Sequence, residues 1–319
     1  MKDSEYTYAV ARIRVHETKL LTESELNTVI AAKSHEEAVR RLREKGYDLT
    51  DGDAEALDKK LRETWELLQS ILPDERQMDA VLIKNDFHNL KVILKALVNE
   101  KSTDGLFRFP SKYDPEELKA LVFARQNDKL PPELQHCDRS AYNILTKTRF
   151  AQLGDSVIDR AAMEWSIDYA KKADDPMIEK LAQLQAALTD IKVIYRCILT
   201  GKADSFKKRA VCDCSYFSKQ TLIDAAQTLN DFFAFLASTP LQNAGRALEE
   251  SPAVFEKYAD DAVTELLTAG KSEIFGITPL LGYWFAVNTE ILNLRIILSG
   301  KATGQSDEII RERMRKTYV

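Results

Sequence analysis

Three carboxylates, Asp260, Asp261 and Glu265, are the residues of this 319-residue chain whose spacing best suits catalytic chemistry. Paired acids on a helix can hold Mg²⁺ for diphosphate chemistry, because hard divalent cations prefer oxygen ligands. A second acidic pair, at 174–175, precedes a proline and is typical of a helix cap rather than of a second metal motif. We therefore interpret the three acids as a solvated helix face. A helical Mg-dependent diphosphate enzyme using Asp260 and Asp261 is kept as an alternative.

Other patterns that carry chemistry are absent from the sequence. It contains no GxxxxGK[ST], GxGxxG, HExxH or GxSxG motif. The four His are scattered without metal-ligand spacing, and the four Cys form no CxxC pair. We predict no catalytic residue, no metal and no cofactor. The basic run Lys207-Lys208-Arg209 is too short to indicate lipid or nucleic-acid binding, so we interpret it as a solvated loop.

The composition favours a helical protein. The chain has only 11 Gly and 9 Pro, which together are about 6% of its residues and roughly half of average usage. Folds rich in hairpins need more turn residues than that, so all-β and Rossmann-type folds fit poorly. A net charge of −5 argues against a dedicated nucleic-acid binder. The sequence start has no apolar signal region, and no stretch is long enough to span a bilayer, so we expect a cytoplasmic protein without membrane insertion.

Helix start signals and helical periodicity recur along the chain. Thr22 with Glu25, and Ser34 with Glu37, have the spacing of capping boxes. Five prolines follow a Ser, Thr or Asp, which is typical of a helix start. Three long segments carry apolar residues that step by four and three, the spacing of one helix face. These stripes predict an all-α fold; they begin at Ile83, Met177 and Leu280.

The ends of these three predicted helices resemble one another. The second ends YRCILTGK and the third LRIILSGK, while the first, LKVILKAL, lacks the final Gly-Lys. The matched basic residues Lys91, Arg196 and Arg295 lie roughly 100 residues apart. We predict three similar repeats, with Gly201 and Gly300 as left-handed C-caps. The predicted boundaries are 1–108, 109–210 and 211–319, with junctions at 106–110 and 203–216.

The matched positions predict specific contacts. Leu90, Tyr195 and Leu294 are expected to be buried at equivalent places. Each matched basic residue should be partly buried and paired with an acid of its own repeat. Arg12 and Arg14 are expected to pair with Glu17 or neighbouring acids, which is a structural role.

Both ends of the sequence resemble a known family, the C subunit of the V/A-type ATPase (ATP synthase), which is the counterpart of the d subunit of the eukaryotic V-ATPase. The first end is ARIRVHETKLL (11–21) with the capped helices after it, and the second is residues 283–319. The second keeps Glu290, Asn293, Arg295 and Gly300, and a last predicted helix that ends at Tyr318. With the repeat, the resemblance covers nearly the whole chain.

The resemblance implies a fold and a function that the residues alone do not supply. It implies a funnel of three similar helical bundles with pseudo-threefold symmetry. It also implies a non-catalytic central-stalk adaptor, peripheral on the inner face of the membrane. This adaptor would link the rotor ring of proteolipid subunits to the D and F subunits of the central stalk and transmit torque for ion transport. An alternative function that does not depend on the family resemblance is that of a generic helical scaffold or interaction protein.

Overall fold

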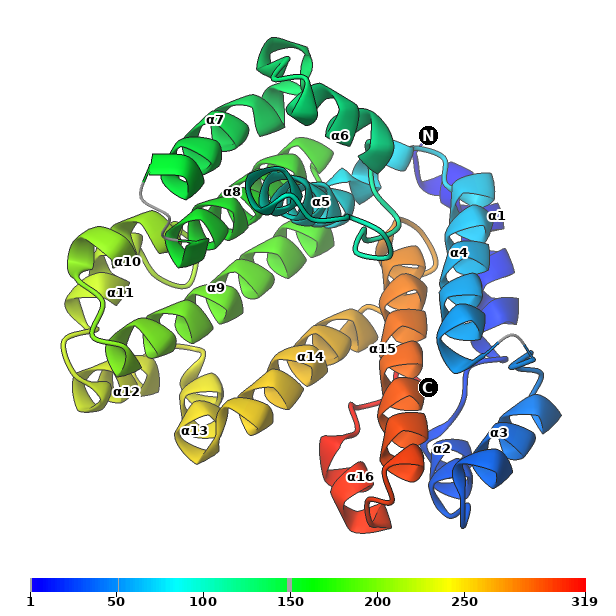
Figure 1. Ribbon diagram of the computed structural model, residues 1–319. Coiled ribbons are helices and arrows are strands. Elements are labelled where there is room, and N and C mark those ends of the chain that lie inside the picture. The colour runs from blue at the N-terminus through cyan, green and yellow to red at the C-terminus, as the bar shows by residue number, and fades with distance from the viewer. Residues whose placement is uncertain (1, 51, 148–150) are drawn as a thin grey trace. The chain divides into compact units, whose positions relative to one another are not determined.

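Figure 1 shows the computed structural model of the chain, which describes residues 2–50, 52–147 and 151–319. Within these residues all regular secondary structure is helical, apart from one isolated bridge between Cys214 and Phe217. The all-α prediction is confirmed. None of the described helices is long and apolar enough to cross a membrane.

The described α-helices range from 6 residues in α11 to 25 residues in α15. In chain order they are α1 (Lys2–Glu17), α2 (Glu23–Ile30), α3 (His35–Glu44), α4 (Asp53–Ile71), η1 (Glu75–Met78), α5 (Asp79–Asn99), α6 (Pro115–Phe123), η2 (Asn127–Lys129), α7 (Pro132–Lys147), α8 (Ala151–Ala173), α9 (Pro176–Leu199), α10 (Asp204–Ala210), α11 (Lys219–Asp224), α12 (Leu229–Ala237), α13 (Gln242–Glu250), α14 (Pro252–Ala269), α15 (Thr278–Ala302) and α16 (Asp307–Arg313).

Local capping explains where many of these helices begin. The Thr22 hydroxyl accepts from the Glu25 N–H, and the Glu25 carboxylate accepts from the Thr22 N–H at 3.0 Å, so this capping box is confirmed. At α3 the Ser34 hydroxyl caps Glu37, but the Glu37 carboxylate accepts from the N–H of Lys33 instead of Ser34. Each such cap pairs an N–H group that the helix itself leaves without a partner.

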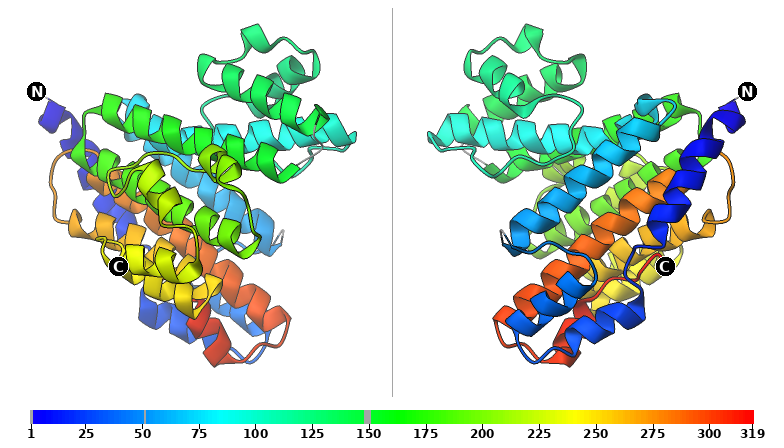
Figure 2. Two further views of the ribbon diagram at one scale, coloured as in Figure 1. Left: turned by 90° about the vertical axis from the view of Figure 1, so that its left-hand side faces the viewer. Right: turned by 90° about the vertical axis from the view of Figure 1, so that its right-hand side faces the viewer.

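The chain forms two compact units, one built from residues up to Glu75 together with Ala247–Val319, and the other from Arg76–Arg246. In the first unit α15 is central and packs against α1, α3, α4, α14 and α16. Figure 2 shows α1 (dark blue) and α15 (orange) running alongside each other. The rings of Trp65 and Trp284 meet edge to face with centroids 5.7 Å apart, which joins α4 to α15 in the core.

In the second unit α8 packs against α5, α7, α9 and α10. Its core includes Phe87, Leu90 and Ile158, all nearly free of solvent contact. The predicted burial of Leu90 is confirmed, as is that of Leu294 in the first unit. Tyr195 is only half-buried, so the prediction is wrong at that position. The division into three repeats and the funnel they would form stay predictions.

Candidate functional site

The side chain of Asn293, on α15, binds the main chain of the C-terminal segment, residues 314–319. The Asn293 side chain is fully buried. Its amide donates to the Arg315 carbonyl at 3.0 Å, and its oxygen accepts from the Arg315 N–H at 2.8 Å. One side chain therefore pairs both main-chain groups of a residue that lies outside any helix, as buried backbone requires.

The same arrangement occurs in α5. The buried Asn89 amide donates to the Arg108 carbonyl at 3.1 Å and its oxygen accepts from the Arg108 N–H at 2.8 Å. One turn earlier, the carboxylate of Asp86 accepts from the N–H groups of Lys112 and Tyr113, at 3.3 and 3.1 Å. The roles of Asn89 and Asp86 were not predicted from the sequence. The signal that was available is a polar residue inside an apolar stripe.

A third long helix, α9, holds the chain that follows it with different residues. The carboxylate of the buried Asp190 accepts from the N–H of Cys212 at 3.1 Å, and the Gln183 oxygen accepts from the N–H of Ser215 at 2.7 Å. Burial raises the pKa of Asp190 to about 7, although the Cys212 N–H opposes this. Thus α5, α9 and α15 each bind a later segment through buried polar side chains, which we call backbone clamps.

Glu290 also binds a main-chain group through a buried side chain, in this case in the N-terminal region of the first unit. Its buried carboxylate accepts from the Leu21 N–H at 2.5 Å and from the Tyr47 hydroxyl. Burial raises the pKa of Glu290, while the Tyr47 and Leu21 hydrogen bonds oppose that change. Glu290 therefore joins α15 to the segment before α2 and to the segment after α3.

The matched basic residues do not pair as the sequence predicted. Lys91 contacts Asp159 at 2.5 Å, and Arg295 contacts Asp58 at 2.6 Å. Both acids lie outside the predicted repeat of their partner, so that prediction is wrong for these two pairs. The Arg295 side chain is 51% exposed, and Arg196 is also exposed. The physical reason is that α5 packs against α8 and α15 packs against α4, so Lys91 and Arg295 each meet an acid from a segment distant in the sequence.

The exposure of the Arg295–Asp58 pair predicts a small effect on stability. Exposed ion pairs contribute about 0–1 kcal/mol, because solvent screens the charges and ordering two long side chains costs entropy. We expect Arg295→Ala to lower the free energy of unfolding by no more than about 1 kcal/mol in urea denaturation. Asp58→Ala serves as the matched variant and should give the same small change. A loss of several kcal/mol in either variant would show that the pair is structurally essential.

The two signature glycines play different roles. Gly201 has φ +61°, and the N–H groups of Gly201 and Lys202 bond back to the carbonyls of Ile198 and Cys197, so the predicted left-handed end is confirmed. Gly300 lies inside α15, and the left-handed position falls to Gly304 at φ +69°. That prediction is therefore wrong for Gly300.

Close packing explains the glycine at position 300. A Cβ there would lie 2.7 Å from Cγ1 of Ile310, a residue fully buried on α16. Glycine allows the two helices to approach, which a sequence pattern at the helix end does not reveal. The first of the three helices, α5, ends without glycine, and Glu100 adopts the left-handed conformation at φ 52°.

Arg14 joins α1 to the loop that follows α14. Its guanidinium pairs with the buried Glu17 at 2.8 Å and donates to the carbonyls of Lys271 and Glu273. The expected pairing of Arg14 with Glu17 is confirmed. Arg12 is exposed and donates to the Tyr8 hydroxyl at 3.1 Å instead of to an acid, so the expected pairing is wrong for Arg12.

Asp260, Asp261 and Glu265 of α14 bind the C-terminal segment. Asp260 pairs with the Arg315 guanidinium at 2.8 Å, and Asp261 accepts from the Lys316 N–H at 2.6 Å. Glu265 contacts the Lys316 ammonium at 2.9 Å. The interpretation as a solvated face holds for Glu265, whose side chain is 61% exposed, and is wrong for the half-buried Asp261. All three acids also accept from donors of the C-terminal segment. Among the described residues no cluster of His, Cys, Asp or Glu has the geometry of a metal site.

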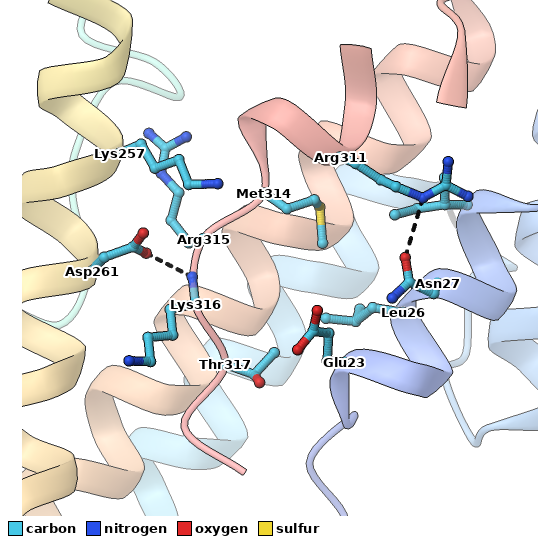
Figure 3. A pocket seen from close by; sticks show the side chains of 11 residues that line it. Glu23, Leu26, Asn27, Lys257, Asp261, Arg311, Met314, Arg315, Lys316 and Thr317 are labelled. Atoms are coloured by element: carbon cyan, nitrogen blue, oxygen red, sulfur yellow. Dashed lines mark hydrogen bonds between the residues drawn. The ribbon is translucent and has the colours of Figure 1, made fainter. Parts of the chain in front are cut away.

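A groove of about 610 Å³ runs beside this segment, between α2, α14 and α16 (Figure 3). We call it the C-terminal groove. Leu26, Ile30 and Met314 supply apolar surface, and Lys257 and Arg311 lie on opposite sides of it. The remaining lining residues are Glu23, Asn27, Asp261, Arg315, Lys316 and Thr317.

The basic run at 207–209 is helical rather than a solvated loop, because it lies in α10. Lys207 is only 5% exposed. Its ammonium contacts Asp204 at 3.0 Å and donates to the Ala226 carbonyl at 2.8 Å. The interpretation as a loop is therefore wrong, and at least one of the three charges serves packing.

Comparison with known proteins places most of the chain in one protein family. Residues 9–313 match the sequence profile of the family described as ATP synthase (C/AC39) subunit. The chain belongs to this family. The match includes Asn89, Asp190, Glu290 and Asn293, so all the backbone clamps lie inside the family's region.

Individual relatives in the C/AC39 family are distant but cover most of the chain. The C subunit of the V-type sodium ATPase of Enterococcus hirae is 24% identical over 278 residues, which are 85% of this chain and 85% of that protein. The C subunit of the A-type ATP synthase of Methanocaldococcus jannaschii is 24% identical and covers 96% of this chain and 85% of its own length. That of Methanosarcina acetivorans is 23% identical, with 98% and 93% covered.

Proposed function

We propose that this protein is a non-catalytic central-stalk adaptor of a V/A-type rotary ATPase. In this role it links the rotor ring of proteolipid subunits to the D–F stalk and transmits torque for ATP-coupled ion transport. It would lie on the inner face of the membrane as a peripheral part of the complex. The observation that carries the proposal is the family match over residues 9–313. Its relatives, which are C subunits of V-type and A-type enzymes, support it.

The packing of the chain is suited to carrying torque. A rotor component must pass on strain without absorbing it, and protein interiors packed at near-crystal density do so. Loops are the compliant parts of such a body. Here Asn89, Asp190 and Asn293 tie post-helical segments to the long helices through buried hydrogen bonds. These bonds stiffen the segments that would otherwise move most easily.

Binding to the stalk proteins tests the proposal. We expect the purified chain to bind recombinant D–F complex from the same organism with a saturable isotherm in isothermal titration calorimetry. In detergent it should bridge D–F to the rotor ring. A titration with ATP in place of D–F is the control and should give no heat of binding and no turnover, since the sequence lacks phosphate-binding motifs.

Two outcomes would favour the alternatives. Absence of D–F binding at low and moderate salt, with both components folded, would leave the generic helical scaffold. Diphosphate hydrolysis that depends on Mg²⁺ and is lost in Asp260→Ala would favour the enzyme alternative. The contacts of Asp260 and Asp261 with Arg315 and Lys316 count against the latter.

A further inference from the structure

The C-terminal groove combines apolar surface with an excess of cationic side chains. Four of its lining residues are Lys or Arg, and two are acidic. The whole chain, by contrast, has a net charge of −5. Cationic side chains that stay accessible in such a groove can attract an acidic partner and orient it, because charge complementarity steers association and selects the ligand.

The two acidic lining residues differ: the carboxylate of Asp261 bonds to the protein itself, and that of Glu23 is exposed. Asp261 is half-buried and accepts from the Lys316 main chain at 2.6 Å, so its carboxylate is turned to the C-terminal segment. Glu23 is exposed at the opposite wall.

The four cationic side chains of the groove differ in their bonding partners. Arg315 and Lys316 pair with Asp260 and Glu265, on α14. Lys257, by contrast, donates to a main-chain carbonyl, that of Glu312 at 3.3 Å. The guanidinium of Arg311 donates to the Asn27 oxygen at 3.3 Å and lies 3.7 Å from Asp307, and its side chain is 45% exposed. Of the cations that line the groove, Lys257 and Arg311 are therefore best placed to bind a carboxylate of another molecule.

The position of these two cations indicates the shape of the ligand. Figure 3 shows Lys257 and Arg311 on opposite sides of the groove with Met314 and Leu26 between them. A single phosphate or carboxylate would need cations that converge on one point. Cations separated by apolar surface suit a polypeptide that presents spaced carboxylates with an apolar side chain between them.

We propose that the C-terminal groove binds an acidic segment of a partner polypeptide, with carboxylates at Lys257 and Arg311 and an apolar side chain against Met314 and Leu26. This surface goes beyond the proposed stalk function. It can be tested without any other component of the ATPase.

The experiment uses the full chain and two labelled peptides of twelve residues, one alternating Glu and Leu and the other with Gln in place of Glu. We expect fluorescence anisotropy at low salt to show binding of the Glu peptide, with affinity at least about tenfold above that of the Gln peptide. Lys257→Glu and Arg311→Glu should each weaken binding about fivefold or more, and Met314→Ser should weaken it as well. Lys257→Gln replaces the reversal if Lys257→Glu fails to fold.

A matched charge reversal elsewhere provides the control. Lys59 is exposed on α4 and does not line the C-terminal groove. Lys59→Glu changes the net charge by the same amount as Lys257→Glu and should leave peptide binding unchanged. The proposal is overturned if the two peptides bind equally, or if Lys59→Glu weakens binding as much as Lys257→Glu. It is also overturned if phosphatidylglycerol vesicles, and not the Glu peptide, bind in a Lys257-dependent manner.

Discussion

Replacing Asn293 by alanine is expected to lower the free energy of unfolding by about 2–4 kcal/mol, because the change removes two buried hydrogen bonds at once. It leaves the N–H and carbonyl of Arg315 without their partner and opens a small cavity beside α15. Urea denaturation followed by circular dichroism measures the loss. The C-terminal segment should also become a substrate for carboxypeptidase once the Asn293 side chain no longer holds the Arg315 main chain.

Asn288→Ala is the matched control for this prediction. Asn288 also lies on α15, is half-buried, and donates only within its own helix, to the Trp284 carbonyl at 2.7 Å. Its replacement should cost less than about 1 kcal/mol, since alanine also has the higher helix propensity. Asn89→Ala in the second unit should resemble Asn293→Ala, because Asn89 makes the same pair of bonds. Equal effects of Asn288→Ala and Asn293→Ala would show that the clamp contributes no special stability.

The buried carboxylate of Asp190 predicts a second large effect, on the pH dependence of stability. Burial raises the pKa of Asp190 to about 7 in the folded protein, above the value of about 4 for an unfolded chain. Between these values the folded state holds a proton that the unfolded state has lost. Stability therefore falls as pH rises through this window, by up to about 1.4 kcal/mol per pH unit, and levels off above the folded pKa.

The comparison of wild type with Asp190→Asn isolates this contribution. The wild type should lose roughly 2 kcal/mol more than the variant between pH 5 and pH 7, since asparagine cannot titrate. The lowered pKa values of His16 and His88 act in the opposite direction within part of this window. They act equally in both proteins and cancel in the difference. Parallel stability curves for the two proteins would contradict the buried, protonated state of Asp190.

Features that depend on residues close together in the chain were predictable from the sequence. The Thr22–Glu25 capping box, the Asp175 N-cap and the left-handed Gly201 all form through bonds between groups within a few residues of each other. The apolar stripes likewise required burial of one face, and Leu90 and Leu294 are fully buried. The family could also be predicted, because its packing signatures occur at both chain ends.

The backbone clamps and the C-terminal groove could not be predicted from residues that are close together in the sequence. Asn293 meets Arg315 only because the chain after α16 returns along α15. Asp261 meets Lys316 across 55 positions, which no local spacing signals. Sequence alone therefore presented the α14 acids as solvated, whereas the folded chain uses them to hold its own end.

By itself the sequence determined the helical class, many helix limits and the family, because intrahelical bonds and apolar periodicity act over a few residues. Only the tertiary structure decided what each polar signature residue touches. Gly300 allows Ile310 to approach α15, and Arg295 stays at the surface beside Asp58. Lys207 is buried and donates to the Ala226 carbonyl. A polar side chain pairs with whichever distant group packing brings within about 3 Å, and that neighbour is set by the path of the whole chain.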